Sequence, residues 1–371
     1  METSPVLVVV TGIPPSLARK RREMTLRLLT YHAKSHGLEV LVIKPSQIAK
    51  GKAWRGFQYD DGQHQWYQRS LNPKSEDFVV FDAMYLADLR VNRSVYQRAV
   101  AYLERHHIAY FNPAIGNKAI LYRLLRTKSA NVPVPWTAVV SHPQEVIRAL
   151  AERECLWFKP VIGSGGRNML LLSNVAKKRV RVEGDRFFGR IIRREVSWSE
   201  LRRLLRIALE ARSYFMQENV NLRETADGRR MDLRITVQRD VKGDWRTVAR
   251  TLRIGARHSV VTNFHAGGKI ESCTHWSPRV AQLLGTVGIT KRTLEAAADV
   301  AVRAATRLGD AYPTLGLLGV DVGVDKDDKL YVYDCNSRPG RDILTNLEIS
   351  KSMREVAGHA AALVAKQRAN L

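Results

Sequence analysis

The sequence is poor in cysteine and has no long apolar run. Its 371 residues include only three cysteines, Cys155, Cys273 and Cys335, which are far apart and lack the spacing of metal ligands. A small, odd number of scattered cysteines argues against a disulfide framework or a zinc cluster and is typical of a reducing compartment. No apolar run approaches the roughly 18 residues that a membrane-spanning helix needs, and the basic cluster at 19–22 follows the apolar run at 6–10. We therefore expect a cytoplasmic protein without signal peptide or membrane span.

Acidic residues are scarce relative to basic ones. The chain has 36 Asp and Glu against 60 Lys and Arg, a formal net charge of +24. Such a field attracts polyanions, whether nucleic acid, nucleotide phosphates or an acidic surface. The basic residues form short, separate clusters, and no zinc finger, aromatic RNA-binding motif or sustained heptad is present. A nucleic-acid partner is therefore not favoured, although charge alone does not choose among these anions and solvated basic faces are the simpler interpretation.

The first third of the chain has the pattern of a parallel α/β unit. Apolar strands are expected at 6–10, 38–43, 78–81 and 108–111, and they alternate with helices at 16–36 and 91–107. A hairpin is expected at 54–71, with its turn at 60–62. Its aromatic residues either pack a small sheet or line a pocket. These elements predict an N-terminal α/β domain over residues 1–112.

The rest of the chain predicts two α+β units. A small antiparallel unit over 113–212 is expected to contain helices at 117–126, from 141 and at 199–211, and strands at 136–140, 156–161, 168–172, 179–183 and 186–193. A second sheet over 213–371 is expected to contain strands at 214–220, 231–238, 245–254, 318–324 and 330–335, with helices at 290–308 and 350–368.

The hairpin near residue 330 carries oxygen ligands. Side chains in a strand alternate between faces, so Asp334 and Asn336 share a face, and a turn through 325–329 folds Asp321 against them. Two carboxylates and an amide oxygen are hard ligands that suit Mg²⁺. The pattern predicts a magnesium site, and the alternative is a surface hairpin with solvated acids.

A second informative stretch lies at 156–167. An apolar strand carries Lys159 near its end and runs into the glycine-rich turn 163–167. A lysine in a buried strand is costly unless it meets an anion, and glycines allow backbone N–H groups to approach phosphate oxygens. The chain has neither G-x-x-x-x-G-K-[ST] nor G-x-G-x-x-G leading into a helix. We interpret the stretch as a phosphate-covering loop; the alternative is a flexible hairpin tip beside a lysine that reaches solvent.

Taken in order, these and further motifs resemble the ATP-grasp superfamily. The motifs are Phe158-Lys159-Pro160, the turn 163–167, Gln217-Glu218-Asn219-Val220, Asp232-Leu233-Arg234, Asn263, Gly267-Gly268, Asp321 and 334–340. Within the superfamily the sequence is most similar to the YheC/YheD-like endospore coat-associated proteins, judged from 232–238, 253–255, 262–263 and 336–341. The resemblance covers about residues 112–345. It implies an ATP-grasp fold, in which two α+β lobes clamp ATP, preceded by a smaller N-terminal α/β domain.

The resemblance also implies roles for individual residues. The ATP-binding residues would be Lys118, Lys159, Gly163, Ser164, Gly165, Gly166, Gln217, Glu218, Val220, Asp232 and Arg234. The metal ligands would be Asp321, Asp334 and Asn336, and the residues near the transferred phosphate would be Arg253, Asn263 and Lys159. Relatives usually carry glutamate where this chain has the shorter Asp334, so binding of one or of two Mg²⁺ ions, with Mn²⁺ as a substitute, stays open. The ribose-binding acid would be Glu224 or Asp227.

The resemblance implies an ATP- and Mg²⁺-dependent ligase that joins a carboxylate to an amine or a thiol through an acyl phosphate. The lobe over 113–212 would carry the phosphate loop, and the lobe over 213–371 the metal site. The carboxylate and the nucleophile are not identified by the sequence, and spore-coat proteins are implied as partners, at the developing coat. One alternative is a structural, non-catalytic coat protein that keeps the ATP-binding fold. Another is a polyanion-binding protein, whose affinity would fall steeply with salt.

Overall fold

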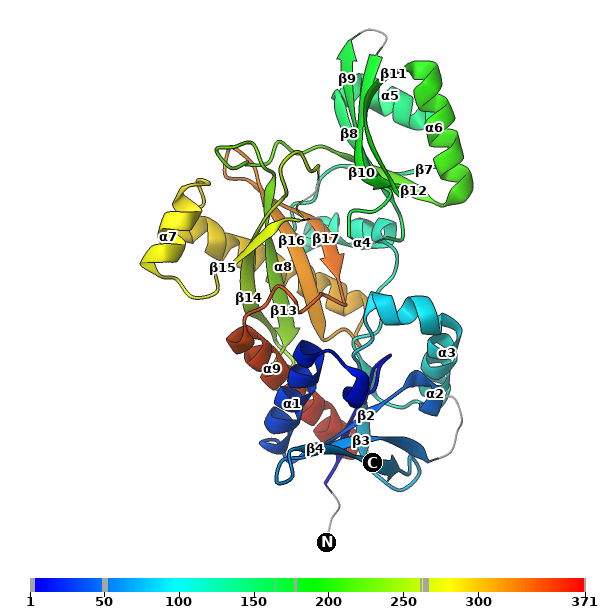
Figure 1. Ribbon diagram of the computed structural model, residues 1–371, viewed down its shortest axis with the longest axis vertical. Helices are drawn as coiled ribbons and strands as arrows, with labels where there is room; N and C mark the ends of the chain where they lie inside the picture. The colour runs from blue at the N-terminus through cyan, green and yellow to red at the C-terminus, as the bar shows by residue number, and fades with distance from the viewer. Residues whose placement is uncertain are drawn as a thin grey trace.

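Three sheets follow one another along the chain (Figure 1). The computed structural model describes residues 4–48, 53–163, 165–176, 179–260, 262 and 267–369. The molecule is elongated, with the first sheet at one end, the middle sheet at the other and the third sheet between them (Figure 1). Within the described ranges no helix is both long and apolar enough to cross a bilayer.

The first sheet has six strands in the order β4-β3-β2-β1-β5-β6. Its elements are β1 (Val6–Val10), η1 (Pro15–Leu17), α1 (Lys20–Lys34), β2 (Glu39–Ile43), α2 (Pro45–Ile48), β3 (Trp54–Asp60), β4 (Gln65–Leu71), β5 (Phe78–Asp82), α3 (Leu86–Arg105) and β6 (Tyr110–Phe111). β1 pairs in parallel with β2 and β5, and β5 with β6, as the alternation of strands and helices predicted. The expected hairpin forms as β3 and β4 at one edge.

The middle sheet has the order β11-β10-β9-β8-β12-β7. Its elements, with the preceding helix, are α4 (Lys118–Leu125), η2 (Lys128–Ala130), β7 (Thr137–Val140), α5 (Pro143–Arg153), β8 (Cys155–Pro160), β9 (Leu170–Ala176), β10 (Arg179–Phe187), β11 (Arg190–Ser197), α6 (Trp198–Ala211) and β12 (Tyr214–Glu218). The pattern had assigned residues 214–220 to the following sheet, and this is wrong, because β12 pairs with β7 and β8. The division of the chain into domains stays a prediction.

The sequence prediction also placed a turn too early in the middle sheet. Two strands at 179–183 and 186–193 imply a turn at Gly184, whereas β10 continues through this glycine and turns at Phe188 and Gly189, whose φ angles are 46° and 82°. A Cβ on Gly184 would lie 2.7 Å from the carbonyl oxygen of Met169. Glycine is therefore required here because the backbones approach closely, and not because the chain turns.

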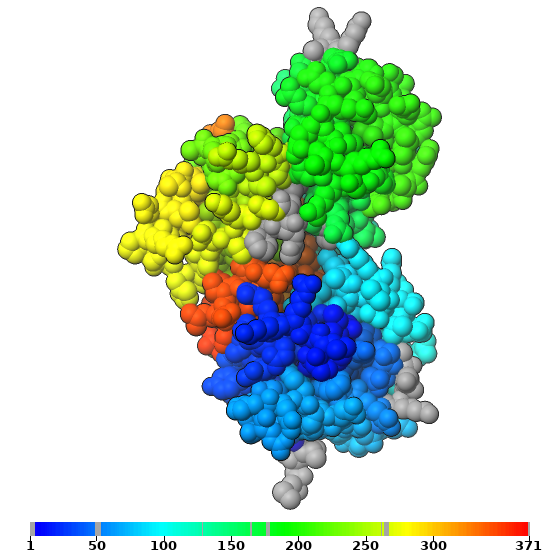
Figure 2. Space-filling view, viewed as in Figure 1, coloured from blue at the N-terminus to red at the C-terminus, as the bar shows by residue number. Residues whose placement is uncertain are grey.

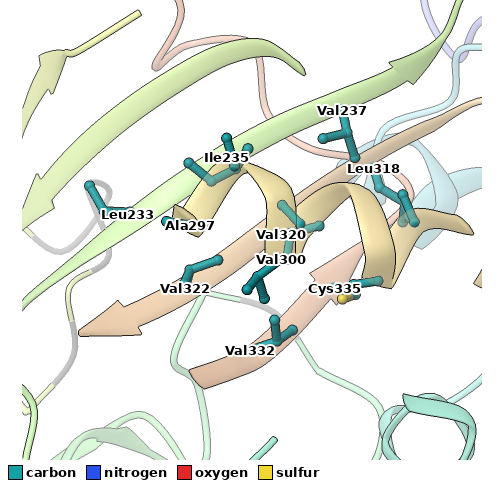
Figure 3. Close-up of a cluster of buried hydrophobic side chains, with 14 of the residues drawn as sticks. Leu233, Ile235, Val237, Ala297, Val300, Leu318, Val320, Val322, Val332 and Cys335 are labelled. Atoms are coloured by element: carbon teal, nitrogen blue, oxygen red, sulfur yellow. The ribbon is translucent and has the colours of Figure 1, made fainter. Parts of the chain in front are cut away.

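The third sheet has the order β15-β14-β13-β16-β17. Its elements are β13 (Met231–Arg239), β14 (Trp245–Ile254), β15 (Lys269–Ser272), α7 (Pro278–Gly285), α8 (Lys291–Ala311), β16 (Leu317–Val324) and β17 (Leu330–Asn336). β15 and α7 were not predicted. The buried aliphatic residues of β13, β16 and β17 point toward α8 (Figure 3). Burying a side chain of this size contributes about 1.5–3 kcal/mol, so this face fixes the sheet and leaves its other face for polar residues.

The last helix, α9 (Asn346–Ala369), joins the first and third sheets. It packs against α1 and β5 as well as against β13 and β14, as Figure 1 shows. A single buried cluster includes Phe81 of β5, Ala249 of β14 and Met353 of α9. The segment 337–345, which connects β17 to α9, therefore lies beside the first sheet.

Candidate functional site

Polar residues from four strands meet on the face of the third sheet that lies away from α8. The register pairs Asp232 with Arg253, Arg234 with Asp321, and Asp321 with Asp334. Asn336 lies two residues beyond Asp334, opposite a glycine of β16. This register confirms the predicted folding of Asp321 against Asp334.

A β-bulge in the hairpin adds a residue that strict alternation does not place. Val322 pairs with Val332 and Asp321 pairs with Asp334, so Tyr333 is the extra residue between them. Its hydroxyl donates a hydrogen bond to the carboxylate of Asp232. Because of the bulge, Val332 and Cys335 both reach the core although they are an odd number of residues apart (Figure 3).

Two guanidinium groups neutralise two carboxylates at the centre of this face. Arg253 donates to Asp232 at 2.6 and 2.7 Å, and its Nη2 lies 2.9 Å from Oδ2 of Asp321. Arg234 forms an ion pair with Asp321 from the other side, with Nη2 3.0 Å from Oδ2. Burial opposes ionisation of Asp321, but Arg234 and Arg253 outweigh it and lower the pKa of this carboxyl to about 2. The four charges balance, which buried ionic groups require.

Helix α4 brings a lysine to the same site. Asn117 caps the helix by accepting a hydrogen bond from the backbone N–H of Ile120 at 3.1 Å. The next residue, Lys118, donates through its backbone N–H to the carbonyl of Val161, just beyond β8. Its side-chain Nζ lies 2.9 Å from Oδ2 of Asp334. The helix start therefore links the end of β8 to the oxygen-bearing strand β17.

Lys159 lacks a carboxylate partner among the described residues. It is 7% exposed, and its Nζ donates to the amide oxygen of Gln217 at 2.5 Å. The ammonium group also lies 5.1 Å from the ring centroid of Trp157 and 5.8 Å from that of Tyr333. Burial, assisted by the nearby charge of Lys118, lowers the pKa of Lys159 to about 7. An anion placed here would stabilise the charged form.

The glycine-rich turn at 163–167 follows Lys159 in the chain, and residues 218–220 follow Gln217, the hydrogen-bond partner of Lys159. The turn joins β8 to β9, which pair antiparallel, and Gly165 and Gly166 have φ angles of 70° and 67° that favour glycine. Residues 218–220 leave β12 and lead to Leu222, which bridges to Asp325 near the third sheet. Glu218 and Val220 thus lie on the connection between two sheets. Ser164 and Asn263 fall outside the described residues.

The oxygen-bearing residues fit a magnesium site in part. Among the described residues no three His, Cys, Asp or Glu side chains converge as metal ligands, so the amide of Asn336 has to be the third donor. Asp334 keeps 27% of its side chain exposed, whereas both carboxylate oxygens of Asp321 already contact arginines. Oδ1 of Asn336 accepts the backbone N–H of Arg338 at 2.9 Å. The donor set suits Mg²⁺ at Asp334 and Asn336, and Asp321 would have to be shared between the ion and the arginines.

Sequence reasoning missed three aromatic residues of the site. Trp157 and Tyr333 flank the ammonium of Lys159, and the hydroxyl of Tyr122 donates to the carbonyl of Tyr333. A signal for Tyr333 is present in the sequence. Val332 and Cys335 are both apolar and need the same face of β17, but they are three positions apart, which strict alternation does not allow and which indicates an extra residue between them. Nothing in the local sequence indicates Tyr122 as a partner, since its contact spans more than two hundred residues.

The architecture matches solved ATP-grasp ligases. The ATP-grasp ligase PsnB, solved with a minimal precursor, Mg and ADP, superposes with a TM-score of 0.53 at 15% identity, covering 96% of this chain and 98% of PsnB. The ADP complex of N5-carboxyaminoimidazole ribonucleotide synthetase also gives a TM-score of 0.53, at 14% identity, and covers 96% of this chain and 78% of the synthetase. At these identities the likeness shows the fold alone, which is the ATP-grasp fold that the motifs implied.

The family follows from the sequence. Residues 107–363 match the family described as YheC/D like ATP-grasp, and the chain belongs to this family. It is similar to the endospore coat-associated protein YheC of Bacillus subtilis (strain 168), with 22% identity over 236 residues. That match spans 64% of this chain and 62% of YheC.

Proposed function

We propose that the protein is an ATP- and Mg²⁺-dependent ligase that joins a carboxylate to an amine or a thiol through an acyl phosphate. The family and the fold support an ATP-dependent ligase, and the kind of bond formed is our inference. The observation that carries the proposal is Lys159, a buried cation whose hydrogen-bond partner is a neutral amide and which stands beside Lys118 and Asp334. A nucleotide phosphate is the anion that this arrangement lacks.

The proposed reaction has two steps. A carboxylate oxygen of the substrate attacks the γ-phosphorus of ATP, the bond to the bridging oxygen breaks, and ADP leaves. The amine or thiol then attacks the acyl carbon and loses a proton to solvent, and inorganic phosphate leaves with the electron pair of the acyl–oxygen bond. Phosphoryl transfer requires mainly positioning and charge neutralisation, so no serine or cysteine nucleophile is needed.

Each residue would contribute position or charge. Lys118 and Lys159 would hold phosphate oxygens, and the turn at Gly163–Gly166 would cover them with backbone N–H groups. Arg253 would orient the transferred group while Asp232 fixes its guanidinium. Asp334 and Asn336, with Asp321, would hold Mg²⁺, which would supply neutralisation of phosphate charge.

The adenine and the cellular setting are further parts of the proposal. The backbone of 218–220, with Gln217, would face the adenine, and Asn263 would lie near the acyl phosphate. We propose a connection with the endospore coat from the name of YheC, with coat proteins as partners.

Nucleotide binding is tested by thermal unfolding. A ligand that binds only the folded state stabilises it by about 2.7 kcal/mol at a hundredfold excess over its dissociation constant. Millimolar Mg·ATP should therefore raise the midpoint of the full chain, and the rise should be smaller for Lys159→Ala than for the exposed-lysine control Lys242→Ala. No rise in a folded sample would remove the nucleotide site.

The acyl phosphate is tested with hydroxylamine. Hydroxylamine replaces the natural nucleophile and converts an acyl phosphate into a stable hydroxamate. With Mg·ATP and a panel of amino acids and short peptides, we expect hydroxamate and ADP in equal amounts. Binding of Mg·ATP without ADP release from any carboxylate in a broad panel would instead favour a non-catalytic, ATP-binding coat protein.

A further inference from the structure

A second cluster of charged residues lies where the first sheet meets the segment 337–345. In the first sheet the chain passes from β1 to β2 on one side and reaches β5 on the other, so the strand order reverses between β1 and β5. Open parallel sheets bind ligands outside the carboxyl ends of their strands at such a point. In Figure 2 the dark-blue residues that follow β1 lie against the orange residues of the 337–345 segment.

Two arginines of the segment 337–345 reach this point and differ in their partners. Arg338 is ion-paired with Asp82 at the end of β5, at 2.5 Å, and donates to the hydroxyl of Tyr96 at 2.6 Å. Arg341 donates from Nη1 to the hydroxyl of Tyr85 at 2.9 Å, and no described carboxylate forms an ion pair with it. Arg338 therefore links the segment to the first sheet, whereas no carboxylate among the described residues neutralises the charge of Arg341.

The buried part of Arg341 is also incompletely bonded. The residue is 9% exposed, and its Nε is buried without a hydrogen-bond partner. Leaving a buried donor unsatisfied costs about 1–3 kcal/mol, and more for a charged group. An anion that accepts from Nε and a terminal nitrogen would remove this cost, because the fork of a guanidinium matches a carboxylate.

The neighbours of Arg341 keep the site positive. Arg22 lies over the ring of Tyr85 at 4.8 Å and is ion-paired with Asp88 at 2.7 Å. Arg21 donates to the backbone carbonyl of Arg341 at 3.3 Å. Together with Arg338, the cluster has four guanidinium groups, and two of them are ion-paired with the carboxylates of Asp82 and Asp88. It carries a surplus of positive charge at the edge of solvent, since Tyr85 is partly exposed.

We propose that Arg341, with Tyr85 and Arg22, binds a carboxylate of the substrate other than the one that reacts. Naming the ligand as a substrate rests on the ligase function proposed above; the anion site rests on the contacts of Arg341. Arg341 follows Asn336 by five residues, so their Cα atoms are at most about 17 Å apart. This is an upper limit, part of which the two side chains cover, and a short acidic peptide spans the rest. The site therefore selects substrates with a second, unreactive carboxylate.

The experiment uses glutarate as the probe and the thermal midpoint of the full chain as the readout, at constant ionic strength, with and without saturating Mg·ADP. Glutarate should raise the midpoint of the wild-type chain, and its neutral diamide should not. Arg341→Ala should weaken the apparent glutarate affinity at least tenfold, and Arg341→Gln, which keeps most of the side-chain volume, should do the same. The control Arg354→Ala, an exposed arginine on α9, should respond as the wild type does.

The outcomes separate this inference from the proposed function. No midpoint rise with glutarate, or a full rise in a folded Arg341 variant, overturns the site. An Arg341-dependent rise with inorganic phosphate but not with glutarate overturns the carboxylate assignment. A glutarate response without any Mg·ADP response leaves the anion site standing and refutes the ligase function.

Discussion

Binding of ATP at pH 8 should draw a proton onto Lys159. With a pKa of about 7 the buried amine is mostly neutral at this pH, and about a tenth of the molecules carry the proton, because one pKa unit is a factor of ten. Contact with phosphate favours the ammonium form and raises the pKa again. The expected uptake is therefore about 0.9 proton per ATP bound, calculated from that ratio.

Titration calorimetry measures this uptake. The binding enthalpy at pH 8 is recorded in several buffers that differ in ionisation enthalpy. When the observed binding enthalpy is plotted against the ionisation enthalpy of the buffer, the slope gives the number of protons exchanged on binding. Lys159→Met keeps most of the length of the side chain and removes the titrating group, so its slope should fall close to zero. Lys242→Met, at an exposed turn, should keep the wild-type slope.

The same pKa predicts how the free protein responds to pH. The folded-state pKa of Lys159 lies below the ordinary value of 10.5, so the unfolded chain binds more protons between about pH 7 and 10.5 and stability gains from Lys159 as pH rises through that window. Below pH 7 Lys159 is mostly charged in the folded protein, and burial of this charge lowers the free energy of unfolding. Lys159→Met should therefore stabilise the ATP-free protein at pH 6 and lose this advantage toward pH 10. In the calorimetric experiment, clear ATP binding by the wild-type protein at pH 8 with a slope of zero, that is without proton uptake, would refute the reasoning.

Two further predictions concern the third sheet. Asp334→Asn should abolish Mg²⁺-dependent turnover while the fold persists, because it removes the partner of Lys118 and a partly exposed carboxylate. Asp334→Glu should preserve turnover, and normal activity of Asp334→Asn would show that the hairpin is only a solvated turn. Leu233→Ala should lower the free energy of unfolding in urea by about 2–5 kcal/mol, because this side chain is fully buried beneath α8. The exposed control Leu347→Ala should change it by less than about 0.5 kcal/mol, and equal losses for the two would contradict the core assignment.

Local patterns predicted the elements whose signals are short in range. The parallel unit at the N-terminus follows from apolar strands that alternate with helices. The hairpin of β16 and β17 follows from alternating side chains on either side of a polar turn. The pairing of Asp321 with Asp334 is a consequence of that hairpin. The polar face of β13 was visible as charges within an apolar run, although their partners were not.

Other features depend on contacts between distant segments. β12 looks like any apolar strand, and only the available edges of β7 and β8 place it in the middle sheet. The strand predicted at 179–183 ended too early, because a glycine at a close approach of two backbones and a glycine in a turn have the same sequence signal. Arg234 and Arg253 meet Asp321 only after β13, β14 and β16 have paired.

The sequence by itself determined the set of chemical groups and the order in which they occur, and this order was enough to indicate the ATP-grasp fold. The tertiary structure decided which charges are neutralised. Lys118, Arg234 and Arg253 acquire carboxylate partners on folding, whereas Lys159 receives an amide and Arg341 a phenol. The reason is physical: burial removes the water that solvates every charge in the unfolded chain, so a charge left without a protein counterion becomes a place for a ligand.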